Sequence, residues 1–287
     1  MASSTVLLEG LAFGEAPRWR DGLLWFSDFY RHAVFTVSSD GTETKVVDVP
    51  AQPSGLGWLP DGRLLVVSMT DRTVLRLEAD GALAVHADLS GLATFHCNDM
   101  LVDAAGRAYV GNFGYDLHKD LTEREIPVVL GDESAGQAVL ARVDPDGTVS
   151  AAASDLRFPN GMALVDGGRT LVVAETLRLG LKAFDVAADG TLSNPRVWAS
   201  LAEHLVAPDG ICADPDGGVW VANALGAHVL RVAEGGEVVD RVETTQLAYA
   251  CAIGGADGRT LFAMTAPSSE PHLVADVRDG RIETATV

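Results

Sequence analysis

The sequence predicts an all-β protein, a six-bladed β-propeller with four-stranded blades around a central channel. Two regular series of turn signals and six copies of one apolar strand pattern support this fold class. The chain has 287 residues, so six equal units would each contain about 48 residues, within the usual range for propeller blades. A β-sandwich would not repeat one four-strand pattern six times.

The turn signals lie between short apolar runs, as hairpin connections do. The first series comprises Asp21-Gly22, Asp61-Gly62, Ala105-Gly106, Gly167-Gly168, Asp216-Gly217 and Asp257-Gly258. The second series falls between these and comprises Asp40-Gly41, Asp80-Gly81, Asp146-Gly147, Asp189-Gly190, Gly235-Gly236 and Asp279-Gly280. Two hairpins per unit account for four strands, so both series predict the same repeat.

The strands that follow these turns are short, continuous and rich in β-branched or aromatic residues, as strands buried on both faces are. One set is predicted at Leu23–Ser27, Leu64–Ser68, Ala108–Gly111, Thr170–Ala174, Val219–Ala222 and Thr260–Ala263. The next strand is predicted at Ala33–Val37, Val74–Leu77, Val139–Val143, Lys182–Val186 and Val229–Val232. Long helical periodicity is absent.

Two parts of the chain depart from the repeat. The sixth unit is short of a strand, and Thr5–Leu8 near the N-terminus is expected to complete it, which would close the ring and remove exposed sheet edges. Residues 1–287 are then expected to form a single propeller domain. The third unit is enlarged by a polar and charged insertion at residues 115–137. Two interpretations of this insertion stay open, a loop over one mouth of the channel and a surface excursion.

The charge and composition of the chain restrict its partners. Its 40 acidic and 21 basic residues give a formal net charge of −19, and such a field repels nucleic-acid phosphates and anionic membrane surfaces. No apolar run approaches the ~20 residues that span a bilayer, and no signal peptide is expected. Three cysteines without C-x-x-C spacing argue against a disulfide framework, so a cytoplasmic setting is expected. The sequence does not indicate the oligomeric state.

Four short segments place a carboxylate or carboxamide beside an expected tight turn before a strand. They are Gly14-Glu15-Ala16-Pro17, Cys97-Asn98-Asp99, Phe158-Pro159-Asn160-Gly161 and Ala207-Pro208-Asp209-Gly210. In a propeller these segments belong to innermost strands, so their side chains are expected to converge in the channel. Oxygen ligands suit Ca²⁺, Mg²⁺ or Mn²⁺, whereas Zn²⁺ more often binds His or Cys. The second and sixth units offer Ser54 and Ala250-Cys251 instead, so the predicted cation site is open on that side.

The order and spacing of these segments resemble the signature motifs of the SMP-30/gluconolactonase/LRE (SGL) family. The resemblance covers nearly the whole chain and rests on Gly14-Glu15-Ala16-Pro17-Arg18-Trp19, Asn98-Asp99, Phe158-Pro159-Asn160-Gly161, Pro208-Asp209-Gly210-Ile211 and Gly254-Gly255-Ala256-Asp257-Gly258. It implies a six-bladed propeller with one catalytic divalent metal ion, for which Ca²⁺ is the first expectation and Zn²⁺, Mn²⁺ and Mg²⁺ are alternatives. By this resemblance Glu15, Asn160 and Asp209 would be the metal ligands. Asn98 would face the metal or the substrate, and Asp209 would also be the general base.

The function that the resemblance implies is metal-dependent hydrolysis of a lactone or a related ester. In this chemistry the metal polarises the carbonyl, and Asp209 accepts a proton from the attacking water and returns it to the leaving alkoxide. The sequence has no G-x-S-x-G nucleophile elbow, which weakens a serine-hydrolase interpretation. Two alternatives stay open: hydrolysis of another electrophile such as an organophosphate, and a non-catalytic propeller that binds calcium or a partner protein.

Two positions differ from the sugar lactonases of this family and indicate a less polar substrate. Those members commonly have an arginine two residues before the asparagine and a glycine after Asn-Asp, where this chain has His96 and Met100. His96 and Met100 are therefore predicted, together with Asn98, to contact the substrate. The apolar side chains expected near the mouth of the channel are those of Phe29, Tyr30, Phe113 and Leu177.

Other polar residues have less specific roles in the sequence. Asp99 is expected as a turn residue or as a support for a ligand. Glu175 is open between supporting the site and ending a solvated strand. The remaining histidines, including His86 and His118, share no ligand spacing and are expected at the surface.

Overall fold

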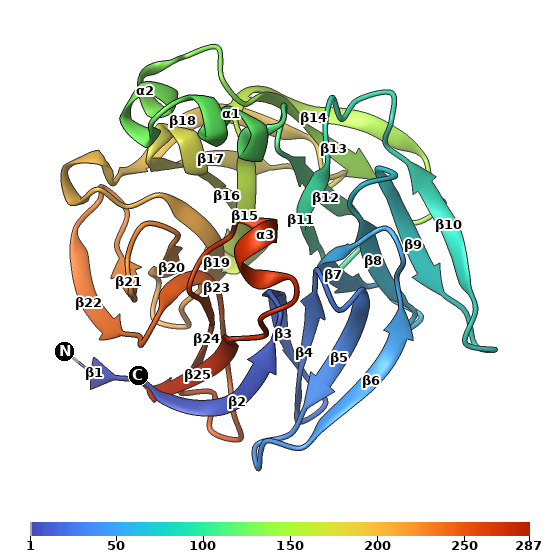
Figure 1. The fold of residues 1–287 in the computed structure, drawn as a ribbon. Coiled ribbons are helices and arrows are strands. Elements are labelled where there is room, and N and C mark those ends of the chain that lie inside the picture. Colours follow the sequence, from blue (N-terminus) through green and yellow to red (C-terminus); the bar gives the residue numbers. More distant parts are fainter. Residues whose placement is uncertain (1) are drawn as a thin grey trace.

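Six mainly antiparallel sheets follow one another around a central channel, in chain order from blue to red (Figure 1). The computed structural model describes residues 2–287 and has the predicted fold, an all-β propeller with six four-stranded blades. In five blades the four main strands run consecutively from the inner edge to the outer edge. The sixth blade takes its outer strand from the N-terminus.

The strands occupy four positions in each blade, counted outward from the channel. The inner strands are β3 (Gly14–Arg20), β7 (Pro53–Trp58), β11 (Cys97–Val102), β15 (Pro159–Val165), β19 (Pro208–Ala213) and β23 (Leu247–Gly254). The second strands are β4 (Leu23–Asp28), β8 (Leu64–Ser68), β12 (Ala108–Asn112), β16 (Thr170–Glu175), β20 (Val219–Asn223) and β24 (Thr260–Ala266). The third strands are β5 (Ala33–Val37), β9 (Thr73–Leu77), β13 (Gln137–Val143), β17 (Gly180–Val186), β21 (His228–Val232) and β25 (Gly280–Thr286). The outer strands are β6 (Glu43–Asp48), β10 (Leu83–Asp88), β14 (Val149–Arg157), β18 (Leu192–Ser200), β22 (Val238–Glu243) and β2 (Thr5–Leu11).

The predicted turns agree with this arrangement except at one position. The first series joins inner to second strands in all six blades, and Gly62 and Gly217 there have φ values of 89° and 94°, a backbone conformation that favours glycine. The second series joins third to outer strands in five blades. The prediction for Asp279-Gly280 is wrong, because this pair leads directly into β25 and the outer strand of that blade comes from the other end of the chain.

Apolar side chains fill the spaces between neighbouring blades. Val172 of the fourth blade lies in one cluster with Val219 of the fifth, and Phe26 of the first blade lies in one cluster with Phe262 of the sixth. All five residues of β8 are buried, as expected for a strand covered on both faces. Each blade therefore depends on its neighbours for burial of its apolar faces.

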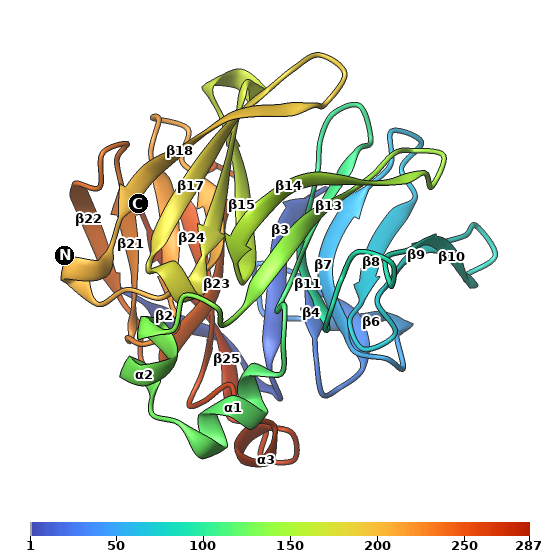
Figure 2. The same ribbon diagram turned by 90° about the horizontal axis from the view of Figure 1, so that it is seen from above.

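The helices gather at one mouth of the channel (Figure 2). α1 (Leu117–Glu123) and α2 (Ile126–Gly131) lie in the predicted insertion, and α3 (Pro271–Val274) lies between β24 and β25. Single 3-10 turns are η1 (Asp166–Gly168), η2 (Thr176–Arg178) and η3 (Ala202–His204). The insertion is thus a helical cover at one mouth, the first of its two open interpretations. None of the helices in residues 2–287 has the length and apolarity that crossing a membrane requires.

The N-terminal segment joins the two ends of the ring. β2 pairs antiparallel with β25, with Thr5 opposite Thr284. β1 (Ala2–Ser3) adds a parallel strand beside β22, so the fifth blade has five strands, which the sequence did not indicate. Both ends of the chain are therefore held in sheets, and the edges that they would otherwise expose are paired.

Glu283 on β25 ties the last blade to this N-terminal segment. Its side chain is completely buried. It accepts hydrogen bonds from the hydroxyl of Ser4, from the hydroxyl of Thr265 at 2.8 Å and from the hydroxyl of Thr245 at 2.7 Å. The amide of Thr245 also donates to it. A buried carboxylate is tolerated when donors of this kind satisfy it.

Replacing Glu283 by alanine is expected to lower the free energy of unfolding by about 2–4 kcal/mol, because donors on three segments, among them the buried hydroxyl of Thr265, lose their acceptor. Thermal and denaturant unfolding would measure the change. Glu9→Ala is the matched control on the same strand pair. Glu9 forms an ion pair with Arg281 (3.4 Å), but the side chain of Glu9 is 67% exposed. The expected change in the free energy of unfolding is therefore below about 1 kcal/mol. Equal effects of the two substitutions would contradict this role of Glu283.

Candidate functional site

Each inner strand is irregular at the end that lies at one mouth of the channel. The pairing of inner and second strands shifts register between Glu15 and Arg18, Pro53 and Leu56, Cys97 and Met100, Pro159 and Met162, Pro208 and Ile211, and Ala248 and Ala250. A bulge of this kind redirects the side chains within it. Of the four polar residues singled out in the sequence, Asn98, Asn160 and Asp209 lie within these bulges and Glu15 borders one. The four residues lie on the inner strands, as predicted, and only the turns expected beside them differ, since these are bulges within the strands.

The glycines beside these residues are required by close contact between blades. A Cβ atom on Gly55 would lie 2.3 Å from the backbone nitrogen of Met100, and one on Gly161 would lie 2.4 Å from the carbonyl oxygen of Asp209. At Gly210 the corresponding atom would lie 2.6 Å from the Cβ of Ala250. None of these three glycines has the positive φ of a turn. The inner strands thus approach one another too closely for any side chain at these positions.

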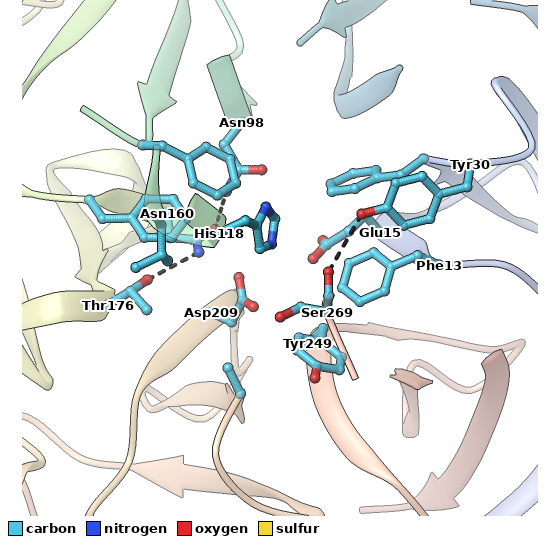
Figure 3. A pocket seen from close by; sticks show the side chains of 15 residues that line it. Phe13, Glu15, Tyr30, Asn98, His118, Asn160, Thr176, Asp209, Tyr249 and Ser269 are labelled. Carbon is cyan, nitrogen blue, oxygen red and sulfur yellow. Dashed lines mark hydrogen bonds between the residues drawn. The ribbon is translucent and has the colours of Figure 1, made fainter. Parts of the chain in front are cut away.

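Figure 3 shows four polar side chains from four blades pointing toward one space in the channel. Glu15, Asn98, Asn160 and Asp209 all line a narrow cavity of ≈ 90 Å³. All four are buried, with exposed fractions of 4%, 4%, 1% and 8%. The predicted convergence of these residues is present in the structure.

A series of hydrogen bonds links the amide groups across neighbouring blades. The hydroxyl of Ser54 donates to Oδ1 of Asn98 at 3.1 Å, and Nδ2 of Asn98 donates to Oδ1 of Asn160 at 2.7 Å. Nδ2 of Asn160 then donates to the hydroxyl of Thr176 at 3.1 Å, which donates to the carbonyl of Pro208 at 2.8 Å. Each bond fixes the orientation of the next group. The amide oxygen of Asn160 therefore has a defined position, and its second lone pair can still bind a cation.

The carboxylates of the site repel one another. Burial raises the pKa of Glu15 well above its ordinary value, and the charges of Asp209 and Asp99 raise it further. Burial, followed by the charge of Asp99, likewise raises the pKa of Asp209. Arg18 acts in the opposite direction on Glu15, but its effect is smaller than those of the two carboxylates. The site therefore contains more negative charge than its own basic groups compensate.

Asp99 lies in the bulge of β11 and adds to this charge. It is buried, and within residues 2–287 its Oδ1 has no hydrogen-bond partner. Burial raises its pKa as well. It does not line the cavity, so its contact with the site is electrostatic.

The donor atoms of the site suit a hard divalent cation. Two carboxylate and two carboxamide side chains line one cavity, and oxygen ligands of these kinds are those that Ca²⁺ and Mg²⁺ prefer. Among residues 2–287 no group of three or more His, Cys, Asp or Glu side chains is arranged to hold a metal ion. A cation here would consequently need the amide oxygen of Asn160 in addition to Glu15 and Asp209. A bound cation would also offset the repulsion between the carboxylates.

The rest of the cavity wall is largely aromatic. Phe29, Tyr30 and Phe113, which were expected near the mouth, line it, and Phe13, Phe158 and Tyr249 complete the aromatic wall. Phe113 stacks on Phe158 with ring centroids 4.2 Å apart, and Phe13 packs against Tyr249 at 4.8 Å. A polar centre with apolar walls is typical of a small-molecule site.

Two predicted substrate contacts do not reach this cavity. Met100 is completely buried, and neither it nor His96 is among the lining residues. The ring of His96 instead stacks on Phe95 with centroids 4.1 Å apart, and burial lowers its pKa. Glu175 is buried and accepts a hydrogen bond from the amide of Arg157, so it supports the strand that precedes Asn160.

Sequence reasoning missed three polar residues that line the cavity: His118, Thr176 and Ser269. His118 was expected at the surface, yet α1 carries its imidazole over the cavity (Figure 3). His86, expected at the surface too, is buried elsewhere with Nδ1 3.2 Å from Arg76. All three residues lie in the segments that follow second strands, at the same mouth of the channel. Their position directly after a predicted second strand is the signal that could have identified them.

Arg157 fixes the insertion in place. Its guanidinium is buried and donates to the carbonyls of Val129 (3.3 Å), Leu130 (3.3 Å), Asp132 (2.8 Å) and Ala135 (3.1 Å). Two of these carbonyls, those of Val129 and Leu130, lie in the last turn of α2, and that of Val129 also accepts from the backbone amide of Asp132. The helical cover is therefore an ordered wall of the site.

Comparisons with known proteins agree with this architecture. The family described as SMP-30/Gluconolactonase/LRE-like region matches residues 13–267. Regucalcin from Danio rerio is 25% identical over 276 residues, which cover 91% of this chain and 85% of the relative.

Two solved structures align over almost the full length. A calcium-binding protein, regucalcin, from Agrobacterium tumefaciens has a TM-score of 0.79 at 21% identity and covers 99% of this chain and 94% of its own. A gluconolactonase from Xanthomonas campestris has a TM-score of 0.75 at 22% identity and covers 98% and 89%, respectively. At these identities the structural matches establish the fold.

In the absence of divalent cations, Asp209→Asn is expected to be more stable than the wild type at neutral pH, and the two should be nearly equal at about pH 4. The pKa of Asp209 is raised in the folded state. Its protonation therefore stabilises the fold fully below the unfolded pKa, and this stabilisation is lost as the pH rises through the folded pKa. Denaturant unfolding of both proteins in the presence of a chelator, from about pH 4 to neutral pH, measures the difference in their free energies of unfolding.

The exposed turn residue Asp216 provides the control. The difference in the free energy of unfolding between Asp216→Asn and the wild type should not grow as the pH rises. If the difference in the free energy of unfolding between Asp209→Asn and the wild type stays constant or shrinks as the pH rises, the repulsion described for the buried carboxylates is contradicted.

Proposed function

This chain belongs to the SMP-30/gluconolactonase/LRE-like family, and we propose that it is a metal-dependent hydrolase that opens a lactone ring or a related ester. One observation carries the proposal: Glu15, Asn160 and Asp209, from three different blades, face one cavity whose remaining wall is mainly apolar. The solved gluconolactonase of the same fold supports the reaction class.

We propose one divalent cation as the cofactor, held by Glu15, Asn160 and Asp209. Ca²⁺ is the first candidate because a solved relative of this fold is described as calcium-binding; Zn²⁺, Mn²⁺ and Mg²⁺ are the alternatives. A cation bound there would polarise the substrate carbonyl and lower the pKa of a water molecule. The raised pKa values of the two carboxylates support this ligand set, because a cation would hold both of them ionised.

Asp209 is the proposed general base. Its carboxylate accepts a proton from the attacking water as the new carbon–oxygen bond forms, and it returns this proton to the ring oxygen when the ring bond breaks. The product is a hydroxy acid, and no covalent enzyme intermediate is required. Asp209 lines the cavity, so a water molecule that enters it would lie beside this residue.

Asn98 is the proposed substrate contact among the polar residues. Its Oδ1 accepts from Ser54 and its Nδ2 donates to Asn160, so the amide is held at the cavity wall without a charged partner. The aromatic wall around it contacts apolar parts of the ligand and excludes water. The proposed substrate is accordingly less polar than a sugar lactone.

A second candidate function is cation binding without catalysis. It is favoured by the relatives named regucalcin, one of which is described as calcium-binding. The same residues would bind the ion in both cases. Hydrolysis of an organophosphate would use the same proton transfer by Asp209 on a different electrophile.

Chelation of divalent cations is expected to abolish lactone hydrolysis, and addition of Ca²⁺ or of one of the alternative cations should restore it. Asp209→Asn should lower kcat by about 10²- to 10⁴-fold, the range for removal of a general base. Asp216→Asn serves as the control and should retain wild-type rates. Turnover that survives both chelation and Asp209→Asn would contradict the mechanism. Cation binding by calorimetry without turnover of any lactone or organophosphate would favour the non-catalytic alternative.

A panel of lactones is expected to show higher kcat/KM for aliphatic and aromatic lactones than for gluconolactone. The reason is the largely aromatic wall, which offers few donors and acceptors to sugar hydroxyls, so those groups would lose hydrogen bonds to water without replacement. Steady-state kinetics with a saturating cation would measure the ratio. A clear preference for gluconolactone would rule out the proposed substrate polarity.

A further inference from the structure

A second cavity, which we call the apolar groove, adjoins the proposed active site at the helix-covered mouth. It has a volume of ≈ 330 Å³, within the range of about 300–1,000 Å³ that is typical of small-molecule sites. Leu121, Ile126 and Leu130 contribute to it from the insertion. Leu177, Leu225 and Leu247 contribute from the fourth, fifth and sixth blades.

The apolar groove is continuous with the wall of the polar cavity. Leu117, Thr176, Ala224, Tyr249 and Ser269 line both cavities. A ligand that reached Asp209 would therefore lie next to the residues that begin the groove. The arrangement places an apolar space beside the reacting centre, on the side where the insertion covers the channel.

The groove exposes apolar side chains that nothing in the fold covers. Ile126 and Leu225 are 43% and 40% exposed, although burial of a large aliphatic side chain stabilises a protein. Leucines exposed singly are ordinary, but exposed apolar side chains gathered in a cavity beside a polar centre are typical of a ligand site. The groove is also formed before any ligand binds, because Arg157 holds the carbonyls of α2 and the segment after it.

The charge of the groove restricts the ligand further. Glu270 contributes the carboxylate at this cavity, and the whole chain carries a formal net charge of −19. A chain that ends in a carboxylate or phosphate would be repelled. A neutral hydrocarbon chain fits both the apolar lining and this field.

We propose that the apolar groove binds an aliphatic chain attached to the lactone ring, so that the substrate class is neutral lactones with an alkyl substituent. This inference rests on the proposed lactone hydrolysis, and it adds a second subsite that selects the substituent. The ring lies in the polar cavity between Asn98 and Asp209, and the chain passes Leu117 and Tyr249 into the groove. Specificity then comes from burial of methylene groups rather than from hydrogen bonds to the ring.

The test compares γ-butyrolactone with γ-lactones that carry a propyl or a hexyl chain. Each buried methylene contributes about 0.8 kcal/mol, so kcat/KM is expected to rise about fourfold per methylene until the groove is filled. Leu225→Asn and Ile126→Asn should each reduce the ratio of kcat/KM for the hexyl lactone to that for γ-butyrolactone by about tenfold or more. Both residues are exposed at the surface, so these substitutions are compatible with folding.

Leu205→Asn is the matched control. Leu205 is 70% exposed and does not line either cavity. It also has a φ of 51°, a conformation that asparagine tolerates well. Its substitution should leave the whole series unchanged. A flat dependence on chain length, or an equal loss for all lactones in Leu225→Asn, would overturn the subsite.

A binding measurement separates the subsite from the reaction. The γ-lactams with the same chains keep the ring and the substituent but resist hydrolysis, so calorimetry reports binding alone. Longer chains should bind more tightly with a more negative heat-capacity change, and Leu225→Asn should remove the gain. If the lactams behave in this way and no lactone is hydrolysed, the subsite stands and the proposed function fails. If lactones are hydrolysed but lactam affinity is independent of the chain, the function stands and the subsite is refuted.

Discussion

The close approach of six inner strands around one channel is the constraint on which the rest of the structure depends. Gly55, Gly161 and Gly210 lie where a Cβ atom would collide with the next strand. At the same level every inner strand is bulged against its second strand. In four of the blades a polar side chain at the bulge lines the same cavity, so residues far apart in the chain meet there. A wider ring would separate these side chains, and a regular ladder would turn some of them away.

This geometry has an electrostatic cost that links the stability of the fold to its proposed function. Glu15, Asp99 and Asp209 are buried close together. Burial raises the pKa of all three, the charge of Asp99 further raises the pKa of Glu15 and of Asp209, and the charge of Asp209 further raises that of Glu15. The hydrogen bonds from Ser54 through Asn98 to Asn160 orient amide groups, but they add no positive charge. Such concentrated negative charge is characteristic of functional sites, where the strain is relieved by a cation or by a proton. The scaffold supplies the stability that this arrangement requires, through apolar packing between blades and through closure of the ring by β2.

The mouth of the channel is built differently from the ring. The insertion with α1 and α2, the segment with η2, and the segment with α3 all lie outside the repeated strands, and each of them contributes a residue to the wall of the same cavity. Arg157 makes the first of these segments an ordered wall by donating to backbone carbonyls of α2 and of the residues that follow it. The residues proposed to carry out the reaction therefore lie on the inner strands, whereas residues proposed to select the substrate lie in the helices and loops at the mouth. This division is common in folds that carry many activities on one scaffold.

The sequence by itself determined the repeat, the strand positions, most turns and the four polar residues of the channel, because these depend on neighbouring residues and on a regular period. The turn predicted at Asp279-Gly280 is wrong because the outer strand that pairs with β25 is β2, at the other end of the chain. Only the tertiary structure decided which side chains reach the cavity: Met100 is buried between blades, His96 stacks on Phe95, and His118 reaches the site from a helix. A bulge or an excursion places a side chain through contacts with distant segments, and these contacts leave no local pattern in the sequence.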